Sequence, residues 1–345
     1  MVREMHGFVD EAELEDWLSR PSRADVEAVR AHPGDFMILG AGGKMGPTLA
    51  LRIQRAVQEA GTAQQVIAVS RFSDARACEA LRSAGIEILS EELLSEGAME
   101  RLPSVENVFY LAGRKFGSSG NAALTWAMNV LLPGRVVERF RLSRIVALSS
   151  GNIYPLMPVG SKGASETIQP GPVGEYAQSV LGRERIFEYG ASEYGARVVN
   201  LRLNYALEPR YGVLLDLGLR VWRHEAVDVT MPAVNVIWQG DANSYALQSL
   251  RLAASPAGIL NIAGAEILRV RDIALAFGAR WKKTVEFCGE EAETALLNDA
   301  TQCRALFGPQ QVGWEQVLEW TAQWIETGAR TLEKPTHFEA RDGKF

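Results

Sequence analysis

The stretch that decides the fold reads FMILGAGGKMG and runs from Phe36 to Gly46. Its first four residues are apolar and typical of a buried strand, and glycines follow before a helical pattern begins. Glycine at such corners allows backbone conformations and close approaches that a Cβ would block. The unpaired N–H groups and the positive dipole end of the next helix attract anionic oxygen. The stretch therefore predicts a turn that holds a pyrophosphate, although glycine-rich turns also close ordinary strand–helix junctions.

The residues after this turn indicate an amphipathic helix. Met45, Leu49, Ile53 and Val57 recur every four residues, which places one apolar stripe against the sheet behind the strand. A strand before the turn and a helix after it are the context that a dinucleotide-binding loop requires. The predicted cofactor-binding residues of the loop are Gly40, Gly43, Lys44, Met45 and Gly46.

Composition excludes several classes of protein. The chain has 345 residues, of which 47% are hydrophobic, so it can bury a large core. A net charge of -6 without a basic run argues against nucleic acid or an anionic membrane as a partner. No stretch approaches the roughly 20 apolar residues that cross a bilayer, and residues 1–30 lack the apolar centre of a secretory signal. We therefore expect a cytoplasmic protein.

Cysteine and histidine usage predicts no metal site. Three cysteines, Cys78, Cys288 and Cys303, cannot all pair internally and lack metal-ligand spacing, which fits a reducing compartment. The four histidines lie far apart in the sequence.

The order of elements predicts an α/β fold with a doubly wound parallel sheet. Short β-rich runs alternate with helical spans, which is the signature of a parallel sheet with helices on both faces. The expected strands are Phe36–Leu39, Val66–Ser70, Ile86–Leu89, Val105–Leu111, Arg144–Leu148 and Val198–Leu201. Binding sites in such sheets lie beyond the carboxyl ends of the strands.

Three regions are expected along the chain. Residues 1–34 form a helical N-terminal extension that could pack on a partner subunit. Residues 35–205 form the dinucleotide-binding domain. Residues 206–345 form mainly a smaller domain that covers the substrate, with some segments returning to the core of the first domain.

The end of the second strand predicts the preferred cofactor. Ser70 and Arg71 stand where an acid would bind the ribose hydroxyls of NAD, and an arginine there would meet the extra phosphate of NADP. We therefore favour NADP(H), with Lys44 as a possible second cation. In the alternative, Arg71 is merely solvated, Asp74 takes the role of the acid, and NAD(H) is the cofactor.

Small residues end the fourth strand. Leu111, Ala112 and Gly113 would let a cofactor lie against the backbone. Arg114 and Lys115 follow at once and could contact a carboxylate or phosphate of the substrate, although exposed cations are common in loops. All five residues are thus predicted at the binding site.

The fifth strand leads into the segment from Ser149 to Tyr154, which reads SSGNIY, and a helix opens at Tyr176. In this order the segments resemble the extended short-chain dehydrogenase/reductases, the NAD(P)-dependent epimerase/dehydratase group. The resemblance covers about residues 35–325. The matching positions are Gly40, Gly43 and Gly46 of G-x-x-G-x-x-G, Leu111-Ala112, residues 149–154, Asn204-Tyr205, Asp241, residues 261–264 and Asp299 through Leu306-Phe307-Gly308.

The resemblance implies a Rossmann-like fold and assigns roles. Ser150 would hydrogen-bond the reacting oxygen and Tyr176 would exchange its proton. Asn204 would lie beside the nicotinamide, Asn152 would touch substrate, and Asn129 would be structural. A free tyrosine has a pKa of about 10, so Tyr176 needs assistance near neutral pH.

Position 180 departs from the family pattern. The family has a lysine four residues after the tyrosine, and here the residue is Val180. Losing that help is expected to slow turnover by about 10² to 10⁴, unless another cation takes its place. Arg183, seven residues after Tyr176, lies within about 20° of the same helix face, and Lys115 is a second candidate.

The resemblance implies an oxidoreductase, epimerase or dehydratase that acts on a hydroxyl or carbonyl of a small polar substrate, by default a sugar or sugar acid. Members often form homodimers through the helices that carry Asn129 and Tyr176. The alternative is a nucleotide-binding sensor or scaffold that kept the fold and lost the chemistry, and Val180 is its best support.

Overall fold

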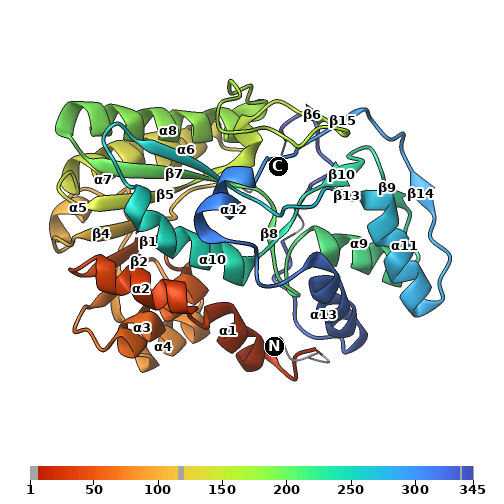
Figure 1. Cartoon of the computed structure of the whole chain (residues 1–345), viewed down its shortest axis with the longest axis horizontal. Coiled ribbons are helices and arrows are strands. Elements are labelled where there is room, and N and C mark those ends of the chain that lie inside the picture. The colour runs from red at the N-terminus through yellow and green to blue at the C-terminus, as the bar shows by residue number, and fades with distance from the viewer. Residues whose placement is uncertain (1–6, 116–119, 335, 345) are drawn as a thin grey trace.

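The computed structural model of the chain describes residues 7–115, 120–334 and 336–344. A seven-stranded sheet, in which every strand pairing is parallel, forms its centre in the order β12-β7-β5-β4-β1-β2-β3 (Figure 1). The strands are β1 (Phe36–Leu39), β2 (Val66–Ser70), β3 (Glu87–Ser90), β4 (Asn107–Tyr110), β5 (Arg144–Ser150), β7 (Arg197–Leu203) and β12 (Gly258–Ile262). The predicted fold class is confirmed.

Helices cover both faces of the sheet because alternate strand residues point to opposite sides. In β1, Phe36 and Ile38 enter a core with α3 (Gly46–Ala60) and α10 (Gln239–Gln248). Met37 and Leu39 enter a second layer on the other face. That layer is formed by α5 (Ala98–Arg101), α7 (Leu132–Arg139) and α8 (Gly174–Tyr194).

A separate hydrophobic core lies beyond the carboxyl ends of the strands. It is formed around α9 (Val213–Trp222), α11 (Val270–Trp281) and α13 (Trp314–Glu326), which Figure 1 shows beside the sheet. Trp320 and Trp324 are buried in this core, so they serve packing.

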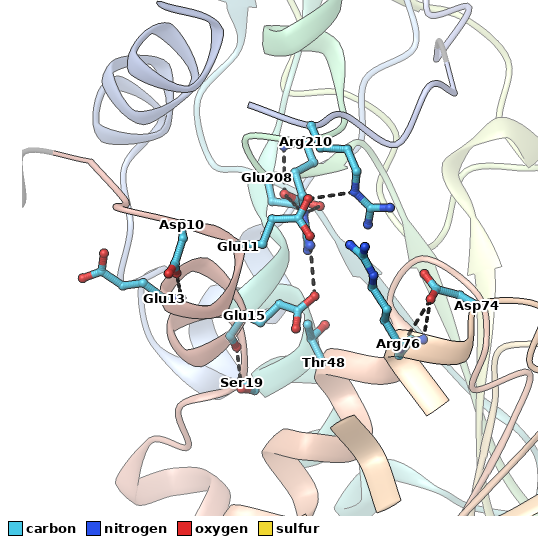
Figure 2. Close-up of polar contacts among 12 residues, drawn as sticks. Asp10, Glu11, Glu13, Glu15, Ser19, Thr48, Asp74, Arg76, Glu208 and Arg210 are labelled. Carbon is cyan, nitrogen blue, oxygen red and sulfur yellow. Dashed lines mark hydrogen bonds and ion pairs between the residues drawn. The ribbon is translucent and has the colours of Figure 1, made fainter. Parts of the chain in front are cut away.

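The N-terminal extension folds on its own chain. Helix α1 (Glu11–Ser19) inserts Leu14 and Leu18 into the second core, whereas α2 (Arg23–Ala31) packs on α3 and α10. Figure 2 shows Glu15 of α1 bound to Arg210, at 3.0 Å. The apolar faces of both helices are covered by the two cores of the same chain, and a contact of this extension with a partner subunit stays a prediction.

The other elements are short. The helices are α4 (Ala75–Ser83), α6 (Ala122–Trp126), α12 (Thr301–Phe307), the π-helix η1 (Ala127–Leu131) and the 3-10 turns η2 (Gly151–Ile153) and η3 (Ser249–Leu252). The remaining strands are β6 (Met157–Pro158), β8 (Ala206–Leu207), β9 (Val227–Asp228), β10 (Ala233–Val234), β11 (Ile237–Trp238), β13 (Leu268–Arg269), β14 (Phe287–Cys288) and β15 (Thr294–Ala295).

The segment after α13 returns to the middle of the molecule. We call residues 329–334 and 336–344 the C-terminal strap. It runs past Arg210, whose carbonyl accepts a hydrogen bond from the Leu332 amide at 3.0 Å, and reaches Gly174 at the start of α8, where Gly343 packs on it. The strap therefore joins the second core to the helix that carries Tyr176.

Within the described part of the chain, no helix is both long enough and apolar enough to span a bilayer. The same residues contain no cluster of three or more histidine, cysteine or acidic side chains that could hold a metal ion.

Candidate functional site

A cavity of about 260 Å³ opens at the carboxyl ends of the central strands, where a parallel sheet places its binding site. The glycine loop forms one wall, and the segments after β5 and β7 form the others. The lining residues are Gly40, Gly43, Lys44, Met45, Gly46, Leu111, Lys115, Leu148, Ser149, Ser150, Asn152, Tyr176, Leu203, Asn204, Tyr205, Ala206, Tyr211, Gly212, Val213 and Thr336.

The glycine loop is shaped as a phosphate cradle. Gly40 has a φ of +89° and lies so close to β4 that a Cβ would stand 2.5 Å from the Ala112 nitrogen. A Cβ on Gly46 would stand 2.4 Å from the Ala41 carbonyl oxygen. No side chain caps the N-terminus of α3, which leaves first-turn N–H groups for an anion. These residues fit a dinucleotide.

The end of β2 carries no acid in the position that would bind a ribose. Ser70 lies next to Gly42, and Arg71 forms an exposed ion pair with Glu92 at 3.2 Å. Asp74 accepts the Arg76 and Ala77 amides at 2.9 and 3.2 Å and thereby caps α4 (Figure 2). The carboxylate of Asp74 is therefore engaged by its own helix.

Ser150 both caps a helical turn and lines the cavity. Its hydroxyl accepts the Asn152 amide at 3.2 Å, so it caps η2, and it donates to Asn152 Oδ1 at 2.9 Å. The same residue lines the cavity together with Tyr176 and Asn152. The alcohol and the phenol that the sequence singled out therefore face one space.

A buried polar network holds these elements in place. Glu184 of α8 accepts a hydrogen bond from Ser149 and an ion pair from Arg202 of β7 at 2.8 Å. Arg202 also donates to the Tyr154 hydroxyl at 2.6 Å, and that hydroxyl donates to Asn261 Oδ1 at 2.9 Å. Because both charges are desolvated and paired, the network fixes the end of β5 relative to α8 and β12.

Position 180 offers no place for a cation. Val180 is fully buried and packs in a small apolar cluster with Ile153, Tyr154 and Ala164. A lysine ammonium there would enter an apolar core, which is unfavourable without a partner.

Arg183 lies outside the residues that line the cavity. Its guanidinium donates to the Leu148 carbonyl at 2.7 Å and to Asn129 Oδ1 at 2.6 Å. A Cβ on Gly113 would stand 2.3 Å from its Nη2, so this glycine makes room for the arginine. Asn129 also accepts the Arg114 amide at 2.9 Å, in the structural role that the family resemblance implied. Whether Arg183 replaces the missing lysine stays a prediction.

Two lysines do line the cavity. Lys44 Nζ donates to the Ala206 carbonyl at 2.5 Å and lies 3.9 Å from the centre of the Tyr211 ring. Burial lowers the pKa of Lys44 to about 7, although nearby Glu208 opposes this shift. Burial likewise lowers the pKa of Lys115 to about 8, and its Nζ donates to the Thr336 carbonyl at 3.4 Å.

Two further phenols stand in the cavity wall. Burial raises the pKa of Tyr205 and of Tyr211, and the neighbouring Asp216 carboxylate and Tyr176 add to the shift of Tyr211. Tyr205 adopts a left-handed φ of +42°, which is uncommon for an aromatic residue. Sequence reasoning quoted Tyr205 without assigning it a role and missed Tyr211 and Thr336 altogether.

The structure divides the predicted site residues into two groups. Those in the cavity wall are Gly40, Gly43, Lys44, Met45, Gly46, Leu111, Lys115, Ser150, Asn152, Tyr176 and Asn204. Those outside it are Ser70, Arg71, Ala112, Gly113, Arg114 and Arg183. Asn204 donates to Asn235 Oδ1 at 2.9 Å, so its amide also ties the wall to the second core.

Comparison with known proteins places these features in context. The sequence signature described as "NAD dependent epimerase/dehydratase family" matches residues 36–210. No curated protein sequence matches the chain.

Solved structures share the fold at low sequence identity. A UDP-glucuronic acid 4-epimerase from Bacillus cereus, solved as a mutant with a fluorinated substrate analogue and NAD, superposes with a TM-score of 0.72 at 16% identity. A UDP-glucose 4-epimerase from Thermotoga maritima with UDP-glucose gives 0.70 at 18%, and one from Thermus thermophilus with NAD gives 0.68 at 20%. Each match covers 85% of this chain and 99% of the other.

Proposed function

Because this chain belongs to the NAD dependent epimerase/dehydratase family, we propose that it catalyses oxidoreduction or epimerisation at a hydroxyl or carbonyl of a small polar substrate. The observation that carries the proposal is the convergence of Ser150 and Tyr176 with the glycine loop on one cavity. A dinucleotide site alone would serve many functions, but an alcohol and a phenol beside it suit proton exchange with a reacting oxygen.

The chain's own residues divide the work. Gly40, Gly43 and the start of α3 would hold the cofactor's diphosphate. A nicotinamide bound here would supply the group that accepts or returns a hydride. Ser150 would orient the substrate oxygen by a hydrogen bond, and Tyr176 would take the hydroxyl proton during oxidation and return it during reduction.

The positive charge that assists Tyr176 is best assigned to the cavity lysines. Val180 stands where the family has its lysine, whereas Lys44 and Lys115 line the same cavity as Tyr176. Their ammonium groups lower the electrostatic cost of a phenolate in the same cavity. Arg183 remains the alternative, and it would act from behind the wall through Leu148.

We further propose NADP(H) as the preferred cofactor and NAD(H) as a weaker one. Arg71 directly follows β2, whose last residue, Ser70, lies beside Gly42 of the glycine loop, and Asp74 is engaged as a helix cap. The UDP-glucuronic acid 4-epimerase and the Thermus thermophilus UDP-glucose 4-epimerase structures contain NAD, so the preference for NADP(H) rests on these residues of this chain alone. The default substrate class is a sugar or sugar acid, as in the sugar-nucleotide enzymes with the same fold.

A homodimer is proposed through the outer face of α6, η1 and α8. Trp126, Leu131 and Tyr189 are 38%, 51% and 56% exposed on these helices, which is unusual for large apolar side chains in one region. A second copy of the chain would cover them through a symmetric helix-to-helix contact.

The sensor or scaffold alternative is favoured by Val180. Purified protein should bind NADPH, which fluorescence titration measures, and should then oxidise it with members of a panel of ketoses, keto acids and aldehydes. Cofactor binding without turnover of any panel member would favour the sensor. Absence of cofactor binding would reject both functions.

A further inference from the structure

The C-terminal strap limits what can bind beside Tyr176. A second, smaller cavity adjoins the first and shares Lys115, Asn152, Tyr205 and Thr336 with it. The glycine-loop side of the first cavity suits the cofactor, so we take the part of a substrate that extends away from its reacting carbon to lie in this second cavity. The dimensions of the second cavity therefore bound the size of the substrate.

The second cavity is small because the C-terminal strap covers one side of it. Phe338, Ala340, Arg341 and Gly343 form one side, and its volume is about 40 Å³. One water molecule requires roughly 10–15 Å³ of cavity volume, so the second cavity holds about three atoms of that size. A carboxylate or a hydroxymethyl group would fit, whereas a nucleoside diphosphate would not.

The strap is anchored at several points along its length. Thr336 donates from its amide and its hydroxyl to Asp216, at 2.8 and 2.6 Å. Phe338 is buried in the second hydrophobic core. Arg341 donates to the carbonyl and the hydroxyl of Thr294, both at 2.7 Å. A substrate with a large second half would have to break such contacts before it could enter.

The chemistry at the boundary between the two cavities favours an anion. Lys115 lines both cavities, and its ammonium group lies beside the Thr336 carbonyl. Asn152, which also lines both, adds an amide that can donate to a carboxylate oxygen. The Asp216 carboxylate opposes the burial-induced lowering of the Lys115 pKa, and the same carboxylate accepts hydrogen bonds from Thr336.

We propose that the substrate is a compact hydroxy or keto acid of monosaccharide size, without a nucleotide, whose carboxylate binds Lys115 and Asn152 under the C-terminal strap. This inference rests on the proposed function, because it takes the reacting carbon to lie at Ser150 and Tyr176. It assigns the strap as the element that determines specificity.

The test compares matched acids on full-length protein that has first been shown to bind NADPH. Glucuronate, galacturonate and gluconate are compared with UDP-glucuronate and with the uncharged sugars, by turnover and by calorimetric titration of the cofactor-loaded protein. At least one free acid should bind and react with a kcat/KM about 100-fold above that of UDP-glucuronate. If the cofactor binds but UDP-glucuronate matches or exceeds every free acid, the inference is overturned and the proposed function stands.

Two variants and one control variant test the carboxylate contact and the role of the strap. Lys115→Met should lower kcat/KM for the acid by about 10-fold or more beyond its effect on an uncharged sugar, because only the acid loses a charged hydrogen bond to the substrate. Arg341→Ala should loosen the strap and raise relative activity with UDP-glucuronate. Lys344→Ala removes an exposed charge from the same segment and should change neither ratio. Equal losses for charged and uncharged substrates in Lys115→Met would reject the carboxylate contact.

Discussion

The ammonium group of Lys44, a residue of the glycine loop, lies 3.9 Å from the centre of the Tyr211 ring. A cation over an aromatic face is attracted by the negative face of the ring. This contact connects the cofactor loop with the segment after β8, and both residues line the cavity. The contact also keeps the titratable amine of Lys44 away from bulk water, and this burial lowers the pKa of the amine.

Lys44 should make stability depend on pH. Burial lowers its pKa to about 7 in the folded protein, from 10.5. Between these values the unfolded chain binds the proton more than the folded protein does, so stability should rise with pH across this window. The benefit is complete above about pH 10.5 and is lost as the pH falls to about 7. Urea unfolding of the wild type and of Lys44→Met at pH 6 to 10 measures this pH dependence of the free energy of unfolding. If the free energies of the two proteins change with pH in parallel, the prediction is contradicted.

Tyr176→Phe removes only the phenolic hydroxyl. Turnover should fall by about 10² to 10⁴, the usual contribution of a positioned acid or base, while the dissociation constant for NADPH stays within a factor of about two. Steady-state kinetics and fluorescence titration measure the two quantities. Tyr194→Phe is the matched control on the same helix, because its side chain is exposed. Similar turnover in both variants would remove Tyr176 from the chemistry.

Arg183 distinguishes a positioning role from a catalytic one. Its two hydrogen bonds hold Leu148 and Asn129, and leaving such buried acceptors without their charged donor costs about 2–4 kcal/mol. Arg183→Met should therefore lower the free energy of unfolding by that amount, as measured in urea. A variant with unchanged stability and strongly reduced turnover would instead support Arg183 as the substitute for the lysine.

Arg71 should determine the choice between the two cofactors. Its exposed ion pair with Glu92 is worth at most about 1 kcal/mol, so the side chain can leave it for a phosphate. Arg71→Ala should weaken NADPH binding about 10-fold or more and leave NADH binding unchanged. Arg82→Ala, an exposed arginine of α4, is the control. Tighter binding of NADH than of NADPH by the wild type would reverse the assignment.

Leu131→Asp should disrupt the proposed dimer. Leu131 is 51% exposed on η1, and a charge there would be buried in a helix-to-helix contact. Light scattering with size-exclusion chromatography should show a dimeric wild type and a monomeric variant. Leu142→Asp, at an 83% exposed position just before β5, should stay dimeric. A monomeric wild type would end the proposal.

Local sequence signals predicted the first domain well. The bounds of β1 and β2 are those expected, because strong apolar runs meet glycine or polar residues at both strand ends. The observed strand bounds differ more from the expected ones where the pairing of neighbouring strands sets the strand length. Strand β5 continues past the expected end at Leu148 to Ser150, because Ser150 pairs with Leu203 of β7. Pro133 lies in the first turn of α7, directly after the π-helix η1, where a residue without an N–H is tolerated.

Sequence patterns alone predict the doubly wound sheet and the glycine loop at its carboxyl edge, since strand ends in a parallel sheet meet at one edge. The convergence of Ser150, Asn152 and Tyr176 was implied by the family resemblance. Packing between distant segments is what desolvates Lys44, brings Tyr211 and Thr336 into the cavity wall and joins α1 to the second core. Periodicity reports which face of an element is buried but not which distant element covers it. Contacts such as that between Lys115 and Thr336, 221 residues apart, follow from packing of the whole chain.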